Sequence, residues 1–110
     1  MMHTMAQPVV TPTGAEPAAL ARAGLSICIP VYNEEGAIRE TLDRCLGLGD
    51  ALREAGVDAF EVIAVDDGSS DGSARIIEND YPAVRLVRHA RNSGYGAALK
   101  TGFASASYGL

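Results

Sequence analysis

A short apolar run that ends in two carboxylates limits the folds open to this chain more than any other segment. Four consecutive apolar residues, Val62 to Val65, are typical of a strand that is buried on both faces. Asp66 and Asp67 follow at once, and a turn rich in Gly and Ser comes after them. Because open α/β sheets bind ligands at the carboxyl ends of their strands, this segment predicts both an architecture and a site.

The remainder of the chain alternates between strand and helix. The spacing of apolar residues predicts three strands and three helices in alternation, at Leu25–Val31, 34–55, Phe60–Val65, 71–79, 83–88 and 96–106. Asn33 and Asp71 precede the first two helices and are expected to be their N-caps. Right-handed crossovers turn this order into a parallel sheet with flanking helices, which is an α/β fold.

The first 24 residues differ in composition from the rest. They are rich in Ala, Pro and Thr and show no sustained hydrophobic period. Pro8, Pro12 and Pro17 oppose both helix and strand, so we expect residues 1–24 to form a disordered leader. Residues 25–110 are then expected to form one domain, because a chain of 110 residues can bury one modest core and not two.

Charge and cysteine content argue against several classes of protein. The net charge of −5 argues against a nucleic-acid-binding surface, which needs a basic patch. Cys28 and Cys45 have no His or second Cys at metal-ligand spacing, so we interpret them as buried free thiols in a reducing compartment. No apolar run approaches the roughly 20 residues that span a bilayer, and no secretory signal is visible. We therefore expect a cytoplasmic chain.

Three polar loops follow the three predicted strands. They are Pro30 to Glu35, Asp66 to Gly72, and Arg91 to Gly96. In a parallel sheet all three lie at one edge, at the carboxyl ends of the strands. This placement of three chemically rich loops is the main argument from the residues for a binding site.

The residues of the first two loops also have structural interpretations. Pro30 can simply end a strand, Asn33 can cap a helix, and Tyr32 can either pack or stack on a planar base. Asp66 and Asp67 are harder to explain in this way, because adjacent carboxylates repel unless a cation or hydrogen-bond donors meet them. We expect Asp67 to contact a ligand and Asp66 to support the turn.

Two further readings of the loops are weaker. Gly94-Tyr95-Gly96 suggests a dinucleotide-binding loop, but the third glycine of that pattern is replaced by Leu99, and only a general preference for an anion such as a diphosphate remains. A calcium-binding EF-hand loop is the other alternative, although the segment before it is predicted to be a strand and not a helix. Its five matching positions are Asp67, Ser69, Asp71, Gly72 and Glu78.

The three loop segments, taken together, resemble a known family. "SICIPVYNEEGAI", "EVIAVDDGSSDGS" and "RNSGYGAALKTGF" are similar to the successive opening motifs of family 2 glycosyltransferases with the GT-A fold. The greatest similarity is to the branch of polyprenyl-phosphate (dolichyl-phosphate) mannosyl- and glucosyltransferases. The resemblance covers about Leu25 to Gly109 and implies the amino-terminal half of a Rossmann-like nucleotide-binding sheet.

The resemblance also implies an activity and a set of site residues. Members of the family transfer a sugar from a UDP- or GDP-sugar, usually with inversion, to an acceptor such as a polyprenyl phosphate or a glycan. Carried over by position, the residues implied to bind the nucleotide sugar are Pro30, Tyr32, Glu34, Val65 and Asp67. Further candidates are Asn33, Asp66, Gly94 and Lys100.

The sequence departs from the family pattern after the third helix. The family places a fourth strand there, ending in an Asp-x-Asp motif that binds Mg²⁺ or Mn²⁺ at the donor diphosphate. The sequence ends at Leu110, where that strand is expected to start, so we expect neither the metal site nor a catalytic residue within these 110 residues. We interpret the chain as an amino-terminal part of the enzyme that is inactive alone, the full-length enzyme acting at the cytoplasmic face of the membrane.

The missing strand has a physical consequence. In the family it pairs beside the first strand, so we expect Leu25–Val31 to have an open edge through which the chain self-associates. A second hypothesis for the function is a non-catalytic, regulatory nucleotide-binding module of the same α/β type. Both hypotheses place a nucleotide at the same three loops.

Overall fold

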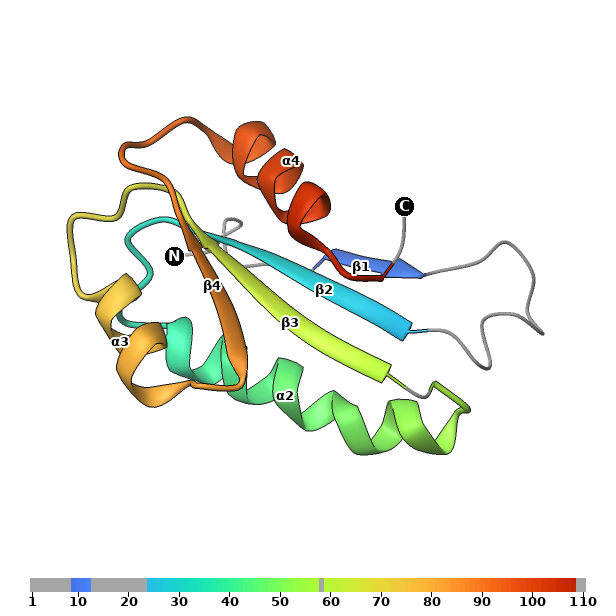
Figure 1. Cartoon of the computed structure of the whole chain (residues 1–110). Coiled ribbons are helices and arrows are strands. Elements are labelled where there is room, and N and C mark those ends of the chain that lie inside the picture. The colour runs from blue at the N-terminus through green and yellow to red at the C-terminus, as the bar shows by residue number, and fades with distance from the viewer. Residues whose placement is uncertain (1–8, 13–23, 58, 109–110) are drawn as a thin grey trace.

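The protein is a four-stranded sheet with helices on both faces (Figure 1). A computed structural model describes residues 9–12, 24–57 and 59–108. The strands lie in the order β1-β2-β3-β4, with β1 antiparallel to β2 and the other three parallel. The elements are β1 (Val9–Pro12), β2 (Gly24–Val31), α2 (Ile38–Glu54), β3 (Ala59–Asp66), α3 (Ser73–Asp80), β4 (Val84–Arg88) and α4 (Tyr95–Ser105).

The core lies on both faces of β2 and β3. On one face, α2 and α3 contribute Ile38, Leu42 and Ile77 to a cluster with alternate residues of the strands, such as Ile29. On the other face, α4 packs its buried Ala98 near Ile63. Figure 1 shows α4 on one side of the sheet and α2 and α3 on the other. Because both faces are covered, β2 is buried along its whole length, which explains its almost uninterrupted apolar sequence.

The predicted alternation of three parallel strands and three helices is confirmed, with small shifts at the boundaries. The largest shift is in α2, which begins at Ile38 and not at residue 34. Asn33 does not cap this helix, so that prediction is wrong. Its backbone has a positive φ of 51°, a conformation that Asn adopts more readily than most residues, and it turns the chain between β2 and the helix.

Two expectations about the amino-terminal segment are also wrong where the structure describes it. Val9–Pro12 forms strand β1, although we expected residues 1–24 to be disordered. A proline is tolerated here because β1 is an edge strand, whose outward groups need no partner within the sheet. β1 also covers the edge of β2 that we expected to be open, in a register that runs from Val9 opposite Cys28 to Pro12 opposite Leu25. Self-association through that edge stays a prediction, and residues 1–8 and 13–23 lie outside the described part.

The two cysteines are free and buried, as the sequence predicts. Burial raises the pKa of both thiols, and the nearby negative charge of Glu61 raises that of Cys28 further. A raised pKa disfavours the thiolate, which is the reactive form. Both residues therefore act as small core side chains. None of the helices in the described part is long and apolar enough to cross a bilayer.

Candidate functional site

The three polar loops meet at the carboxyl edge of the parallel strands, as the sequence predicts. Figure 1 shows the connections after β2, β3 and β4 gathered at the same end of the sheet. The first loop spans residues 32–37, the second 67–72 and the third 89–94. The second loop lies between the other two and is hydrogen-bonded to both. The contacts that join them come largely from the motif residues themselves.

Asn33 holds the first loop against the second. Its side-chain Oδ1 accepts hydrogen bonds from the backbone N–H groups of Ser70 (2.8 Å) and Asp71 (3.3 Å). Its own backbone N–H donates to Ser69 Oγ at 2.9 Å. Thus Asn33 both donates a hydrogen bond to the second loop and accepts hydrogen bonds from it.

The two glutamates that follow are also part of this junction. The backbone N–H of Glu34 donates to Ser73 Oγ at 2.8 Å, and Glu34 is only 3% exposed. Glu35 Oε1 accepts the N–H of Gly72 at 3.0 Å, and the Glu35 N–H donates to Asp71 Oδ2 at 3.1 Å. These reciprocal bonds fix the first loop and the start of α3 relative to each other.

Asp67 joins the second loop to the third. Its side chain is fully buried, with 0% exposure. Oδ1 accepts the backbone N–H of Ser93 at 2.8 Å and lies 2.7 Å from His89 Nδ1, while Oδ2 accepts the N–H of Gly94 at 2.8 Å. An ionised carboxylate can only accept hydrogen bonds, so Nδ1 of His89 must carry the proton. Both carboxylate oxygens are therefore engaged by the protein itself.

His89 extends this connection to α4. Its second ring nitrogen, Nε2, lies 2.8 Å from the hydroxyl Oγ1 of Thr101. The imidazole thus bridges a carboxylate at the end of β3 and a hydroxyl on α4. Sequence reasoning missed His89, because a single histidine after a strand carries no recognisable pattern.

The residues predicted to bind a nucleotide fall into two groups. Those that belong to strands or to the buried junctions are Pro30, Glu34, Val65, Asp66 and Asp67. Those with exposed or half-buried surface near the loops or on α4 are Tyr32, Asn33, Gly94 and Lys100. Contact of any of them with a nucleotide stays a prediction. Tyr32 is one of the side chains with accessible surface at this edge.

Asp66 differs from its neighbour. The residue is 1% exposed, and its Oδ2 accepts the N–H of Ser69 at 3.1 Å, which supports the turn as expected. Its other oxygen, Oδ1, is buried and accepts no hydrogen bond from the described residues. A buried carboxylate oxygen without a donor is costly, so this atom is the part of the pair that is suited to a further donor.

The acidic residues of the second loop do not converge. Asp67 bonds the third loop, whereas Asp71 accepts hydrogen bonds from the N–H and hydroxyl of Ser73. The segment before them is strand β3, so the geometry of an EF-hand is absent here and the calcium interpretation is not supported. Within the described residues, no three His, Cys, Asp or Glu side chains are close enough together to hold a metal ion.

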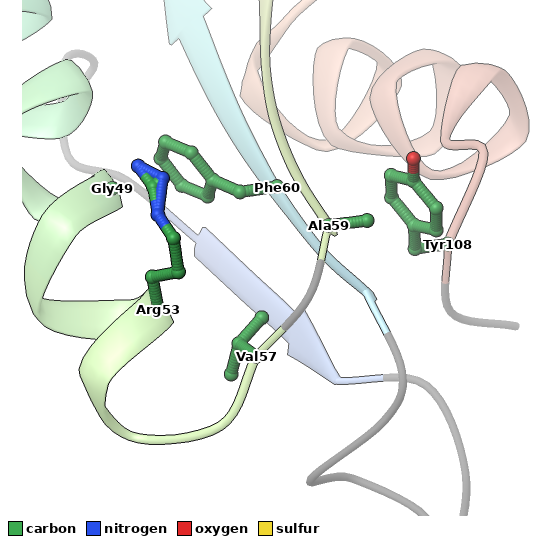
Figure 2. A pocket seen from close by; sticks show the side chains of 6 residues that line it. All are labelled: Gly49, Arg53, Val57, Ala59, Phe60 and Tyr108. Atoms are coloured by element: carbon green, nitrogen blue, oxygen red, sulfur yellow. The ribbon is translucent and has the colours of Figure 1, made fainter.

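A cavity of about 380 Å³ lies away from these loops (Figure 2). It is placed at the start of β3 and the end of α2, where Arg53, Phe60 and Tyr108 line it with smaller neighbours. That position is the amino end of the strands. Its lining contains none of the residues that the motifs single out, so we do not assign the site to it.

We expect the folded chain to lose stability in acid because of two carboxylates in the second loop. Burial raises the pKa of Asp67, but the hydrogen bonds from His89, Ser93 and Gly94 outweigh it, and the pKa is lowered. The pKa of Asp71 is lowered in the same way by bonds from Ser73 and Glu35. A lowered folded-state pKa gives stability that is present above the unfolded value of about 4 and is lost as the pH falls through the folded value.

We therefore expect the free energy of unfolding, measured with urea at a series of pH values, to fall below about pH 4. Asp71→Asn is expected to reduce the steepness of that fall. Asp50→Asn, on an exposed part of α2, serves as the control and should leave it unchanged. An equal reduction by both substitutions would contradict this assignment of the acid sensitivity.

Comparison with known proteins supports the resemblance. Residues 26–108 match the family described as "Glycosyl transferase family 2". An undecaprenyl-phosphate 4-deoxy-4-formamido-L-arabinose transferase from Pseudomonas aeruginosa (strain LESB58) is 44% identical to this chain, and the match covers 72% of the chain and 23% of the relative. Enzymes of the same name from Shewanella sediminis (39% identical) and Edwardsiella ictaluri (37% identical) match 72% of the chain and 24% of their own length.

These matches place the chain in a family while covering only part of its relatives. The chain spans about a quarter of the length of the curated relatives it matches. No solved structure matches it. The family match nevertheless extends from β2 to the residues after α4 and includes all three loops. The chain belongs to the family 2 glycosyltransferases.

Proposed function

We propose that this chain forms the nucleotide-binding part of a glycosyltransferase that transfers a sugar from a UDP- or GDP-sugar to a polyprenyl phosphate. The observation that carries the proposal is the hydrogen-bonded union of the three family motifs at the carboxyl edge of the sheet. Ligands of open α/β sheets bind at this edge. The names of the relatives, which act on undecaprenyl phosphate, support a polyprenyl-phosphate acceptor.

The proposed donor pocket uses the surface that the loops leave accessible. Tyr32 is half-buried at the rim and has an aromatic face on which a base can stack. Asp66 is buried beneath this surface and supports the turn of the second loop by accepting the N–H of Ser69. The third loop leads into the amino-terminal turn of α4, whose backbone N–H groups favour an anion such as the diphosphate. Asp67 and Glu34 serve this pocket from beneath by holding the loops.

The metal that the family's chemistry uses is not assigned to the described residues, because they gather no set of ligands for it. When bound, Mg²⁺ or Mn²⁺ would offset the charge of the leaving diphosphate. The residues of this chain contribute binding and orientation of the donor. We therefore expect the 110-residue chain to bind nucleotide weakly and to catalyse no transfer alone.

Calorimetric titration of the chain with UDP and with GDP, each with and without Mn²⁺, tests this function. We expect weak binding of one nucleotide that Mn²⁺ does not strengthen. Tyr32→Ala should weaken it about tenfold, because stacking of a base on an aromatic ring is worth roughly 1–3 kcal/mol. Tyr32→Phe keeps the ring and should retain the affinity.

Three results would contradict the proposal. The first is no binding of either nucleotide by the folded chain. The second is a Tyr32→Ala variant that binds as well as the parent. The third is tight binding that is independent of Tyr32, which would favour the alternative of a regulatory nucleotide-binding module.

A further inference from the structure

His89 lies at the centre of the contact between β3, β4 and α4. It directly follows β4, and its backbone N–H donates to the carbonyl oxygen of Asp66 at 2.8 Å. The parallel register pairs Asp66 with Arg88, the last residues of the two strands, so the residues that follow them, Asp67 and His89, also lie side by side. Main-chain pairing alone therefore places the imidazole beside Asp67.

Both ring nitrogens of His89 are engaged. Nδ1 is 2.7 Å from Asp67 Oδ1, and Nε2 is 2.8 Å from Thr101 Oγ1. The His89 side chain is 17% exposed and that of Asp67 is 0% exposed, so water competes little for these bonds. A threonine hydroxyl can donate or accept, and the ring can thus keep both contacts whether or not it is protonated.

The carboxylate that His89 contacts is also the one that holds the third loop. The same oxygen, Asp67 Oδ1, accepts the N–H of Ser93, and Oδ2 accepts the N–H of Gly94. Gly94 has a positive φ of 102° and immediately precedes α4. The direction of the N–H groups at this turn therefore depends on how the carboxylate is oriented.

We infer that His89 is a positioning residue for the donor site: its ring joins Asp67 to Thr101 of α4, a contact that we call the clamp, and thereby sets the conformation of the loop that precedes α4. Without the imidazole, the carboxylate retains its two backbone donors but loses the contact that fixes its rotation. This inference rests on the proposed function only in its last step, the assignment of the third loop to the donor. The clamp itself is a property of the chain without nucleotide.

Amide hydrogen exchange in a matched pair of variants tests the clamp. In His89→Asn, the side-chain amide nitrogen takes the place of Nδ1 and can still donate to Asp67. In His89→Gln, the longer side chain carries its nitrogen to the position of Nε2, near Thr101, and leaves Asp67 without its third donor. We expect the Ser93 and Gly94 amides to exchange about tenfold faster in His89→Gln and within about twofold of the parent in His89→Asn.

The amide of Ile63, in the core of β3, serves as an internal reference for global stability. If the clamp acts on the loop specifically, His89→Gln changes the exchange rates of the Ser93 and Gly94 amides more than that of the Ile63 amide. Thr101→Val should accelerate the same two loop amides, whereas Thr41→Val makes the same chemical change on α2, across the sheet, and should not. Equal acceleration of Ile63 and the loop amides, or equal behaviour of the Asn and Gln variants, would overturn the inference.

The unsubstituted chain supplies an independent measurement that needs no variant to fold. Nitrogen-15 spectra of the neutral imidazole are expected to show His89 protonated at Nδ1, the less common form in water, because a carboxylate faces that atom. Protonation at Nε2 would refute the clamp.

Titration of the Asn and Gln variants with UDP and GDP then tests the link to the donor. We expect weaker nucleotide binding in His89→Gln than in His89→Asn. If neither nucleotide binds to the parent while the exchange and the tautomer are as expected, the clamp stands and the proposed function fails. If nucleotide binds equally well to both variants, the clamp does not serve the donor site.

Discussion

Asp67→Asn is expected to lower the free energy of unfolding by about 3 kcal/mol. The side chain is fully buried, and its two oxygens meet three donors, from His89, Ser93 and Gly94. Asparagine keeps one acceptor oxygen and replaces the other by an NH₂ group, which then faces a donor. At least one buried donor loses its partner, and the hydrogen bonds that remain lose the assistance of the carboxylate charge.

Urea unfolding followed by circular dichroism measures this effect, and thermal unfolding should show a midpoint lower by about 15 °C. Asp50→Asn provides the matched control, since Asp50 is exposed and its ion pair among the described residues is with Arg53 on the same helix. We expect that control to stay within about 0.5 kcal/mol of the parent. If the two variants lose equal stability, Asp67 does not hold the loops as described.

Asp66 and Asp67 show which parts of the structure could be predicted from the sequence. The apolar run before them predicted a buried strand correctly, because a strand covered on both faces needs no polar alternation. The polar loops could also be placed at one edge, since parallel strands end on the same side. The gathering of the three loops at one edge was therefore predictable from local patterns and topology alone.

The partners of the two carboxylates were not predictable in the same way. Consecutive residues of a strand point to opposite faces, but their neighbours depend on the register with β4, which no local pattern specifies. That register brings His89 to Asp67. The structure gives Asp67 three protein donors, and its contact with a ligand stays a prediction.

Asn33 and β1 were missed for related reasons. Asparagine is a common N-cap residue, but the side chain of Asn33 accepts its hydrogen bonds from the second loop and not from the helix that follows it. β1 contains Pro12, which opposes strand formation in general but is acceptable at the edge of a sheet. In both cases tertiary contacts overrode a local preference.

Gly68→Ala is expected to lower the free energy of unfolding by about 3 kcal/mol or more. Gly68 has a positive φ of 77°, a conformation that costs an alanine about 1–2 kcal/mol. A Cβ atom at this position would also lie 2.5 Å from the backbone carbon of Arg91 and from the backbone nitrogen of Asn92. Backbone atoms cannot rotate away as a flexible side chain can, so the second and third loops would have to separate.

Gly47→Ala is the matched control and is expected to act in the opposite direction. Gly47 lies within α2, and apart from its two neighbours and the backbone of its own helix, a Cβ there meets no atom of the described residues within 4 Å. Alanine in a helix interior is favoured over glycine by roughly 0.5–1 kcal/mol, so this variant should gain stability. Urea unfolding of the two variants therefore compares the same substitution, glycine to alanine, in two places: Gly68 at the junction of two loops and Gly47 on the surface of a helix. A Gly68→Ala variant within 1 kcal/mol of the parent would contradict the close approach of the two loops, and with it the geometry on which the proposed donor site is built.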